Sequence, residues 1–269
     1  MRLIIALCLT LLAAPLAAQE RTPSHCRALA SDIATVMPAS WQNAVPDEQV
    51  LIHYVAHASF LIRSHGGLNM VTDFTGFVGN VPMIPDVVTM NHAHDTHWTA
   101  NPDPAIPHVL RGWGEEFGAG IEHKLDLGEV LVRNVSTDIR SQWSGSEPNG
   151  NSIFIFEMAG LCIGHLGHLH QIPSTEQYAK IGRLDVVMVP VDGGYTLDLE
   201  SMMQIVSRLR SSIVIPMHWF SGFSLQDFLG GMQEEFAVVE VGGPTLIVSR
   251  DRLPGRPTIM VLRPEWLRE

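Results

Sequence analysis

The sequence predicts an α/β protein in which two β-sheets pack together and helices lie outside them. Short β-prone runs follow one another from Glu48 onward, and helical patterns alternate with strands from about residue 174. Hydrophobic residues make up 46% of the 269 residues and charged residues 17%, which is an ordinary globular composition and excludes a disordered or fibrous chain. Nothing in the sequence indicates a second domain or a short repeat.

Residues 1–18 have the pattern of a signal peptide. Arg2 precedes an apolar run that extends from Leu3 to Leu16, and Ala17-Ala18 provide small residues at a cleavage site. The run is too short for a stable transmembrane span. We therefore expect an exported protein, periplasmic or secreted, without stable membrane insertion.

After the signal peptide, residues 19–47 are predicted to form an accessory segment and residues 48–269 the main domain. The accessory segment contains one predicted helix, near His25 to Met37. Export leaves two cysteines in the mature chain, Cys26 and Cys162. They either form a disulfide in an oxidising compartment or leave Cys162 as a buried free thiol.

The main domain begins with strands and later alternates strands with helices. The predicted strands cover residues 50–55, 59–63, 68–72, 86–90, 129–135, 152–157, 161–165, 184–190, 212–216, 237–240, 245–249 and 257–262. Helices are predicted to start after Ser174, which is a plausible N-cap, and to cover residues 197–209 and 224–235. Residues 99–125 and 138–151 contain many turn-forming residues and are predicted to be loops.

The formal net charge of −11 bears on the partners of the protein. It disfavours nucleic-acid binding, which requires clustered Lys and Arg to neutralise phosphates. A neutral or cationic small-molecule substrate fits this charge more easily. No Gly-rich phosphate loop precedes a predicted helix, and no Gly-x-Ser-x-Gly nucleophile turn is present. The oligomeric state is not indicated.

Three histidines, His92, His94 and His97, fall within six residues directly after the predicted strand 86–90. Neutral imidazoles are common metal ligands, and three of them with one water form a typical catalytic zinc shell. In extended backbone, residues two apart point to the same side, so His92 and His94 are expected to bind one ion together. His97 reaches the same ion or a neighbouring one if the chain coils after His94. The alternative is a polar loop that happens to be rich in histidine.

This spacing resembles the metal motif His-x-His-x-Asp-His of the metallo-β-lactamase superfamily. The likeness covers roughly residues 48–250, and the flanking stretches resemble the branch with the ascorbate-phosphate lactonase-like and N-acyl-phosphatidylethanolamine phospholipase D-like hydrolases. It implies a four-layer αββα sandwich and a metal-dependent hydrolase. The flanking stretches that carry the likeness are His57-Ala58-Ser59-Phe60, His165-Leu166-Gly167-His168 and Pro216-Met217-His218-Trp219.

The resemblance also implies which residues hold the metal, one or two zinc ions, with manganese or iron as alternatives. The implied ligands are His92, His94, His97, His168 and His218, with His165 as a further candidate. The alternative for His165 is a core histidine that binds backbone atoms.

The motif departs from the family pattern in three places. Thr96 stands where the family has the motif aspartate, and the carboxylate is one residue earlier, at Asp95. Asp95 is therefore the candidate general base or compensating ligand. His168 stands where the family has an aspartate that often bridges two metals. No histidine occurs near residues 135–138, where the family has a further ligand and where Asp138 is the available substitute.

Several residues are expected around the ligands rather than among them. His57 is a candidate for substrate binding or for a structural role, and Trp98 and Trp219 either line the substrate pocket or pack in the core. Asp73 either orients a ligand histidine or binds backbone N–H groups at a strand end. Asp192 either contacts the site or only stabilises a turn, which is the commoner role.

These observations predict an exported metal-dependent hydrolase that uses a metal-bound water on an ester, lactone, amide or phosphoester. The alternative is a metal-binding protein with a degenerate, non-hydrolytic site, since the family aspartates are missing. A redox centre with iron is a third possibility that the motif supports less well.

Overall fold

The structure, a computed structural model, describes residues 37–141 and 145–269. The predicted signal peptide, most of the accessory segment and Cys26 lie outside the described residues. The predicted helix near His25 to Met37 also lies outside them, except that Met37 belongs to a strand. The predicted domain boundaries stay a prediction.

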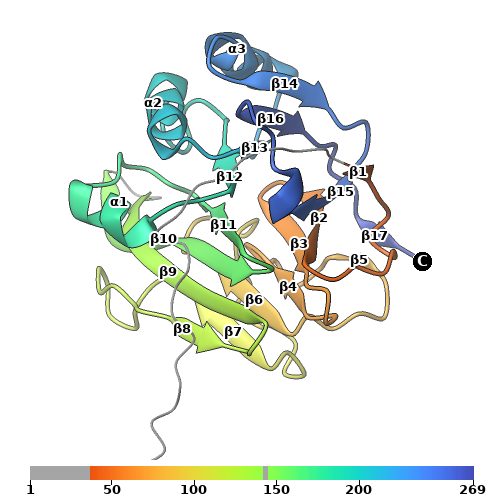
Figure 1. Ribbon diagram of the computed structural model, residues 1–269. Helices are drawn as coiled ribbons and strands as arrows, with labels where there is room; N and C mark the ends of the chain where they lie inside the picture. The colour runs from red at the N-terminus through yellow and green to blue at the C-terminus, as the bar shows by residue number, and fades with distance from the viewer. Residues whose placement is uncertain (1–36, 142–144) are drawn as a thin grey trace, which may run out of the picture.

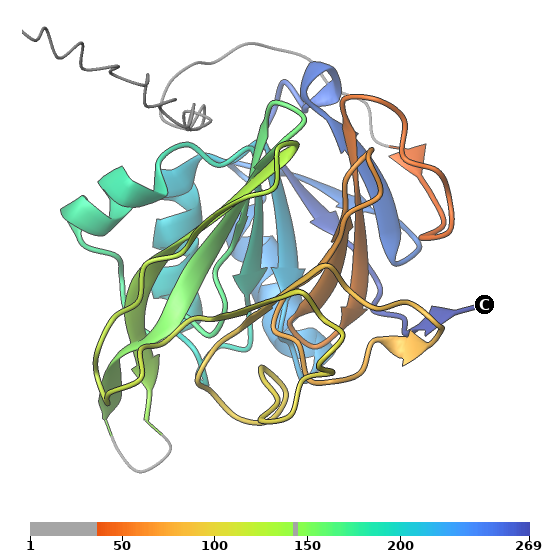
Figure 2. The same ribbon diagram turned by 90° about the horizontal axis from the view of Figure 1, so that it is seen from below.

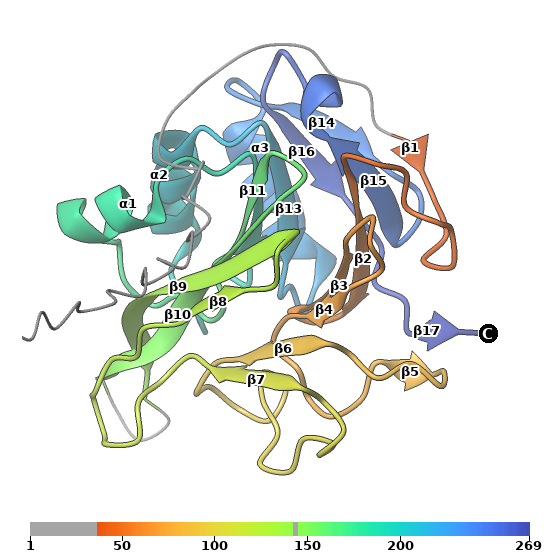
Figure 3. The same ribbon diagram turned by 60° about the horizontal axis from the view of Figure 1, so that its bottom comes forward.

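Two large sheets face each other (Figures 1 and 3). The first has seven strands, which are, in spatial order, β1 (Met37–Pro38), β15 (Thr245–Ser249), β2 (Gln49–Ala56), β3 (Ser59–Arg63), β4 (Asn69–Val71), β6 (Val87–Met90) and β7 (His108–Arg111). The second has eight strands, which are β14 (Ala237–Glu240), β16 (Thr258–Val261), β13 (Ile213–Met217), β12 (Val186–Pro190), β11 (Leu161–His165), β10 (Ser146–Met158), β9 (Val130–Arg140) and β8 (Lys124–Asp126). A separate pair joins β17 (Leu267–Arg268) to β5 (Gly79–Asn80).

The main core lies between the two sheets. Along β2, Ile52 and Tyr54 face the second sheet, whereas Val55 packs on the outer face of the first. Along β10, Phe156 faces the first sheet, and its neighbour Ile155 faces outward toward the helices. Successive side chains of a strand point to opposite faces, so the near-continuous apolar runs of these strands allow them to bury both faces.

Three α-helices, α1 (Thr175–Ile181), α2 (Leu199–Leu209) and α3 (Gly222–Met232), lie on the outer side of the eight-stranded sheet (Figure 3). Ser174 caps α1 through a capping box with Gln177, as the sequence predicts. Across the described ranges, no α-helix covers the outer face of the seven-stranded sheet. Loops and the β5–β17 pair cover it instead, through a cluster that includes Phe74 and Leu267.

Two of the predicted loops contain strands, so these predictions are wrong. Residues 99–125 include β7 and the beginning of β8. Residues 138–151 belong in large part to the long hairpin of β9 and β10 (Figure 2), with a register shift between Glu147 and Asn151. Their Ser, Asn, Gly and Pro residues are typical of turns, but strand pairing overrides this local preference. In the described part of the chain, no helix is long and apolar enough to cross a membrane.

Candidate metal centre

Five histidines meet at one edge of the sandwich, where strands end. His57 lies in the turn between β2 and β3, His94 and His97 follow β6, His168 follows β11, and His218 follows β13. The strands β11, β12 and β13 run parallel, so their carboxyl ends lie at the same edge of the sheet. This is the edge at which open α/β sheets usually bind ligands.

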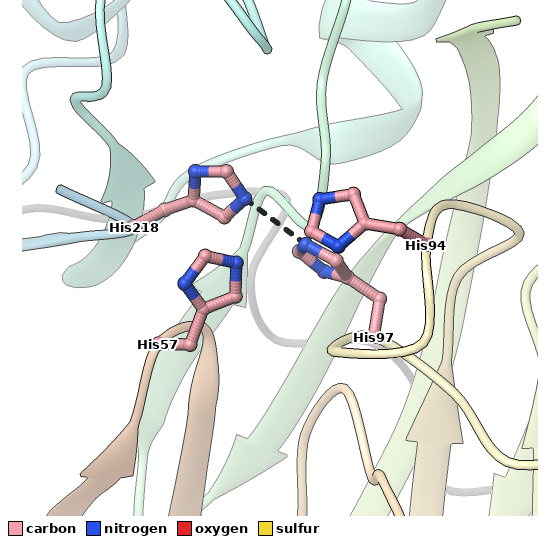
Figure 4. Close-up of side chains that lie close together, drawn as sticks. All are labelled: His57, His94, His97 and His218. Atoms are coloured by element: carbon pink, nitrogen blue, oxygen red, sulfur yellow. Dashed lines mark hydrogen bonds between the residues drawn. The ribbon is translucent and has the colours of Figure 1, made fainter. Parts of the chain in front are cut away.

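Four of these imidazoles point toward one another (Figure 4). His57, His94, His97 and His218 each offer one ring nitrogen, and these atoms all lie within 4.8 Å of one another. The Nε2 atoms of His97 and His218 are only 3.0 Å apart. Tetrahedral zinc with nitrogen ligands holds its donors about 3.3 Å apart, so a small rearrangement would let this cluster enclose one ion.

His168 adds a fifth ring to the cluster. Its ring centroid lies 5.3, 4.9 and 5.1 Å from those of His94, His97 and His218. The side chain is buried, and neither ring nitrogen has a hydrogen-bond partner within residues 37–141 and 145–269. Buried polar atoms are normally hydrogen-bonded. The unpaired nitrogens of His168, and the unpaired Nε2 of His57, are what a site for a cation requires, so the residues present fit a metal ion.

Oxygen atoms lie behind three rings of the cluster, close to their Nδ1 atoms. Nδ1 of His97 lies 2.5 Å from a carboxylate oxygen of the fully buried Asp73, and Nδ1 of His218 lies 3.0 Å from a carboxylate oxygen of Asp192. Nδ1 of His94 lies 2.7 Å from the hydroxyl of Thr96. A ring that donates its Nδ1–H to such an oxygen keeps its Nε2 lone pair free for a metal.

The backbone around the cluster is strained. His57, Asp73 and His218 have φ angles of 47°, 41° and 59°, a region that residues other than glycine rarely adopt. The backbone N–H of His218 donates to the carbonyl of His57 at 2.9 Å, and the Tyr54 hydroxyl donates to the same carbonyl at 2.6 Å. Strained residues of this kind cluster at functional sites, where surrounding contacts hold them in place.

The electrostatics of the cluster favour neutral imidazoles. Burial, and then the charge of His218, lowers the pKa of His57 and of His168 to about 3. Burial also lowers the pKa of His94 and of His97. Although burial acts to raise it, the pKa of Asp192 is lowered by hydrogen bonds from His218 and Thr196. Neutral imidazoles beside an ionised carboxylate are the protonation states that a divalent metal requires.

Comparison with known proteins identifies the family. The sequence model of the β-lactamase superfamily domain matches residues 51–218, which is more than half of the chain. The chain belongs to the metallo-β-lactamase superfamily. It is 24% identical to the UPF0173 metal-dependent hydrolase of Nanoarchaeum equitans over 183 residues, 62% of this chain and 83% of the relative. It is also 24% identical to one of Methanospirillum hungatei, over 62% of this chain and 82% of the relative.

Solved structures confirm the fold. A protein of Thermotoga maritima, described as a zinc-dependent hydrolase of the metallo-β-lactamase superfamily, superposes with a TM-score of 0.57 at 24% identity, covering 79% of this chain and 98% of that one. A metallo hydrolase of Ignicoccus hospitalis gives a TM-score of 0.51 at 18% identity, covering 69% of this chain and 91% of that one. The predicted α/β sandwich of this superfamily is therefore confirmed, with loops and the β5–β17 pair in the place that the predicted four-layer αββα arrangement gives to a second helix layer.

His92, the first histidine of the superfamily motif, does not join the cluster in the structure. Its Nδ1 lies 2.7 Å from a carboxylate oxygen of Glu147, and its ring stacks on Trp113 at a centroid distance of 4.9 Å. The sequence-based expectation that His92 and His94 lie side by side assumed extended backbone. The strand β6 ends at Met90, so the alternation of side chains does not continue through the motif.

His165 is placed as a core histidine, in line with the alternative reading. Its Nε2 lies 2.7 Å from the carbonyl of Ala58, and its Nδ1 accepts the N–H of Gly167 at 3.2 Å. Both ring nitrogens are therefore engaged. Asp138 is likewise engaged by the backbone, since its carboxylate accepts the N–H of Asn149.

The remaining predicted residues take different places. Asp95 is exposed and is not part of the histidine cluster, although its charge acts to raise the pKa of the adjacent His94. Trp98 donates its indole N–H to the carbonyl of Ala93. Trp219 packs on Tyr54 in the core rather than on the histidines. The roles assigned to these residues stay predictions.

Sequence reasoning missed two neighbours of the cluster. The ring of Phe220, which is exposed, lies 5.4 Å from that of His57 and 5.3 Å from that of His218. It also contacts the exposed Tyr195 at 5.2 Å. Their positions directly after β13 and in the turn after β12 were the available signal, because loops at that edge line the site.

Proposed function

We propose that the protein is an exported metal-dependent hydrolase whose metal centre is the histidine cluster. The observation that carries the proposal is the arrangement of His57, His94, His97 and His218, with donor nitrogens within 4.8 Å of one another. The buried carboxylates of Asp73 and Asp192, which lie beside His97 and His218, support it further. A bound divalent ion would supply an acidified water and polarise the scissile group; zinc, manganese and iron all suit imidazole ligands.

The residues of the chain have distinct parts in this proposal. His94, His97, His168 and His218 would hold the ion together with His57. Asp73 and Asp192 orient their histidines and keep the Nε2 lone pairs directed inward. Asp95 is proposed as the general base, the residue that takes a proton during the reaction, because it is ionisable, exposed and adjacent to His94.

Export is supported by the signal-peptide pattern of residues 1–18 and by one cysteine. Cys162 is disulfide-bonded. Disulfides persist in oxidising compartments such as the periplasm or the extracellular space. We propose an uncharged or cationic small-molecule ester, lactone, amide or phosphoester as substrate, in keeping with the net charge of −11.

The test is metal-dependent turnover. The purified protein is stripped with a chelator, reloaded separately with zinc, manganese or ferrous iron, and assayed on a panel of lactones, carboxylic esters, amides and phosphoesters. Turnover that needs the metal and is abolished in His97→Asn supports the proposal. Metal-loaded protein that turns over no member of the panel refutes it in favour of the metal-binding alternative. That alternative is favoured by Thr96, whose hydroxyl stands where the superfamily has a carboxylate.

A further inference from the structure

We infer that this centre binds a single metal ion and that His92 is held outside it as part of a neighbouring cavity wall. The inference rests on the proposed function and adds the number of ions and the place of His92. Metal centres of the proposed kind hold one ion or two, and the two arrangements demand different positions of the donor atoms. The positions of the donor atoms in the described residues favour one of these two arrangements.

The spacing of the donors suits one ion. Two-metal hydrolytic centres hold their ions about 3.5–4 Å apart. With metal–nitrogen bonds of about 2.0–2.1 Å, ligands on the far sides of the two ions would lie about 7.5–8 Å apart. The donor nitrogens of the four clustered histidines all lie within 4.8 Å of one another, which is nearer to the largest donor separation on one ion, about 4.2 Å, than to the separation across two ions.

No carboxylate in the described ranges is available to bridge two ions within this cluster. Asp73 accepts hydrogen bonds on both oxygens, from Asn91 and from His97. One carboxylate oxygen of Asp192 accepts backbone N–H groups, and the other accepts the hydroxyl of Thr196 and lies 3.0 Å from Nδ1 of His218. His168, which stands at the bridging position of the superfamily, presents one lone pair as a neutral imidazole and cannot bridge.

His92, the remaining motif histidine, is held by contacts of its own. Glu147 binds its Nδ1 at 2.7 Å, and Trp113 stacks on its ring with an angle of 20° between the planes. Its backbone N–H donates to the carbonyl of Gly150 at 3.0 Å. Glu147 lies at the register shift of β10, so an irregularity of the strand places the carboxylate against His92.

In this position His92 lines a cavity. Together with Trp113, Phe117 and Glu147 it lines a cavity of about 310 Å³ next to the loop that carries His94. The aromatic side chains of this wall suit part of a substrate, and its carboxylate suits an uncharged or cationic one. The geometry thus gives His92 a place in the pocket and leaves the metal to the cluster.

The experiment is metal counting by elemental analysis of the full chain after saturation with zinc and removal of free metal. It compares the wild type with His92→Ala, His94→Ala and His65→Ala. His65 is the matched control, because it is an exposed histidine held by a glutamate, Glu129, at 3.3 Å. His94 is also exposed, so its replacement tests a cluster ligand without opening the core. Circular dichroism verifies that each variant is folded.

The inference requires one zinc per chain in the wild type, in His92→Ala and in His65→Ala, with zinc affinity lowered by about tenfold or more in His94→Ala alone. Two zinc ions in the wild type, with one lost in His92→Ala, would overturn the inference and leave the proposed hydrolase standing. A wild type that binds no metal would overturn the inference and the proposed function together. A competition titration with a chromogenic chelator gives the affinities.

Discussion

Replacing Asp73 by Asn tests whether the buried carboxylates tune the metal centre. The side chain keeps its shape, but an NH₂ donor replaces one of its two oxygen atoms. In the native protein one carboxylate oxygen accepts from Asn91 at 2.8 Å and the other from Nδ1 of His97 at 2.5 Å. In Asp73→Asn the amide NH₂ must face one of these two donors. A buried donor left without an acceptor costs about 1–3 kcal/mol.

The expected result is a loss of zinc affinity of about 10–100-fold, which is the usual effect of removing an outer partner of a metal-binding histidine. This corresponds to about 1.4–2.7 kcal/mol of binding free energy. Zinc affinity is measured by competition with a chromogenic chelator. Asp198→Asn is the control, because Asp198 is an exposed helix N-cap and Asn is an equally good cap. Wild-type affinity in a folded Asp73→Asn variant would refute the reasoning.

Three further predictions concern stability. Gly167→Ala should lower the free energy of unfolding by about 1–3 kcal/mol, because Gly167 has φ of 62° and an added Cβ would meet the side chains of Asn91 and Asn151. In the control Gly194→Ala the added Cβ meets no atom within 4 Å, so stability should not change. Equal melting temperatures for the two variants would contradict this prediction. Burial lowers the pKa of His165 to about 4. The unfolded chain therefore binds this proton first as pH falls below ~6.5, and His165 should cost about 2 kcal/mol of stability at pH 5 relative to pH 7.5. Urea unfolding in the presence of chelator should show a smaller acid loss in His165→Gln; an unchanged loss would contradict the assignment. Zinc at 100 times its dissociation constant should stabilise the protein by about 2.7 kcal/mol, seen as a higher melting temperature that chelator reverses and that His94→Ala lacks at the same zinc concentration.

The parts of the fold that local sequence determines were predictable. The strands Ser59–Arg63 and Leu161–His165 have the predicted bounds, and Ser174 caps α1. Apolar runs bounded by turn residues and a side-chain cap depend only on nearby residues. The β9–β10 hairpin was missed between residues 136 and 151, because its polar residues gain their strand conformation from pairing with each other across the hairpin.

Which histidines join the cluster depends on contacts between distant segments, which no local pattern reveals. His57 joins the cluster because its carbonyl accepts hydrogen bonds from Tyr54 and from the backbone of His218, which brings two strand ends together. His92 leaves it because Glu147, on another sheet, binds its ring. The sequence motif places His92 in the cluster and His57 beside it, and the structure has the reverse.

This exchange has a consequence for how the site works. In the proposed centre His57 takes the place of His92, at the ends of β2 and β13, where His57 and His218 have positive φ angles of 47° and 59°. Such backbone geometry costs about 1–3 kcal/mol per residue, and in the proposed centre a cation held by both rings would offset part of this cost. The positive φ angles, the unpaired nitrogens of His168 and the carboxylates behind the rings all fit the proposed binding of one cation among neutral imidazoles.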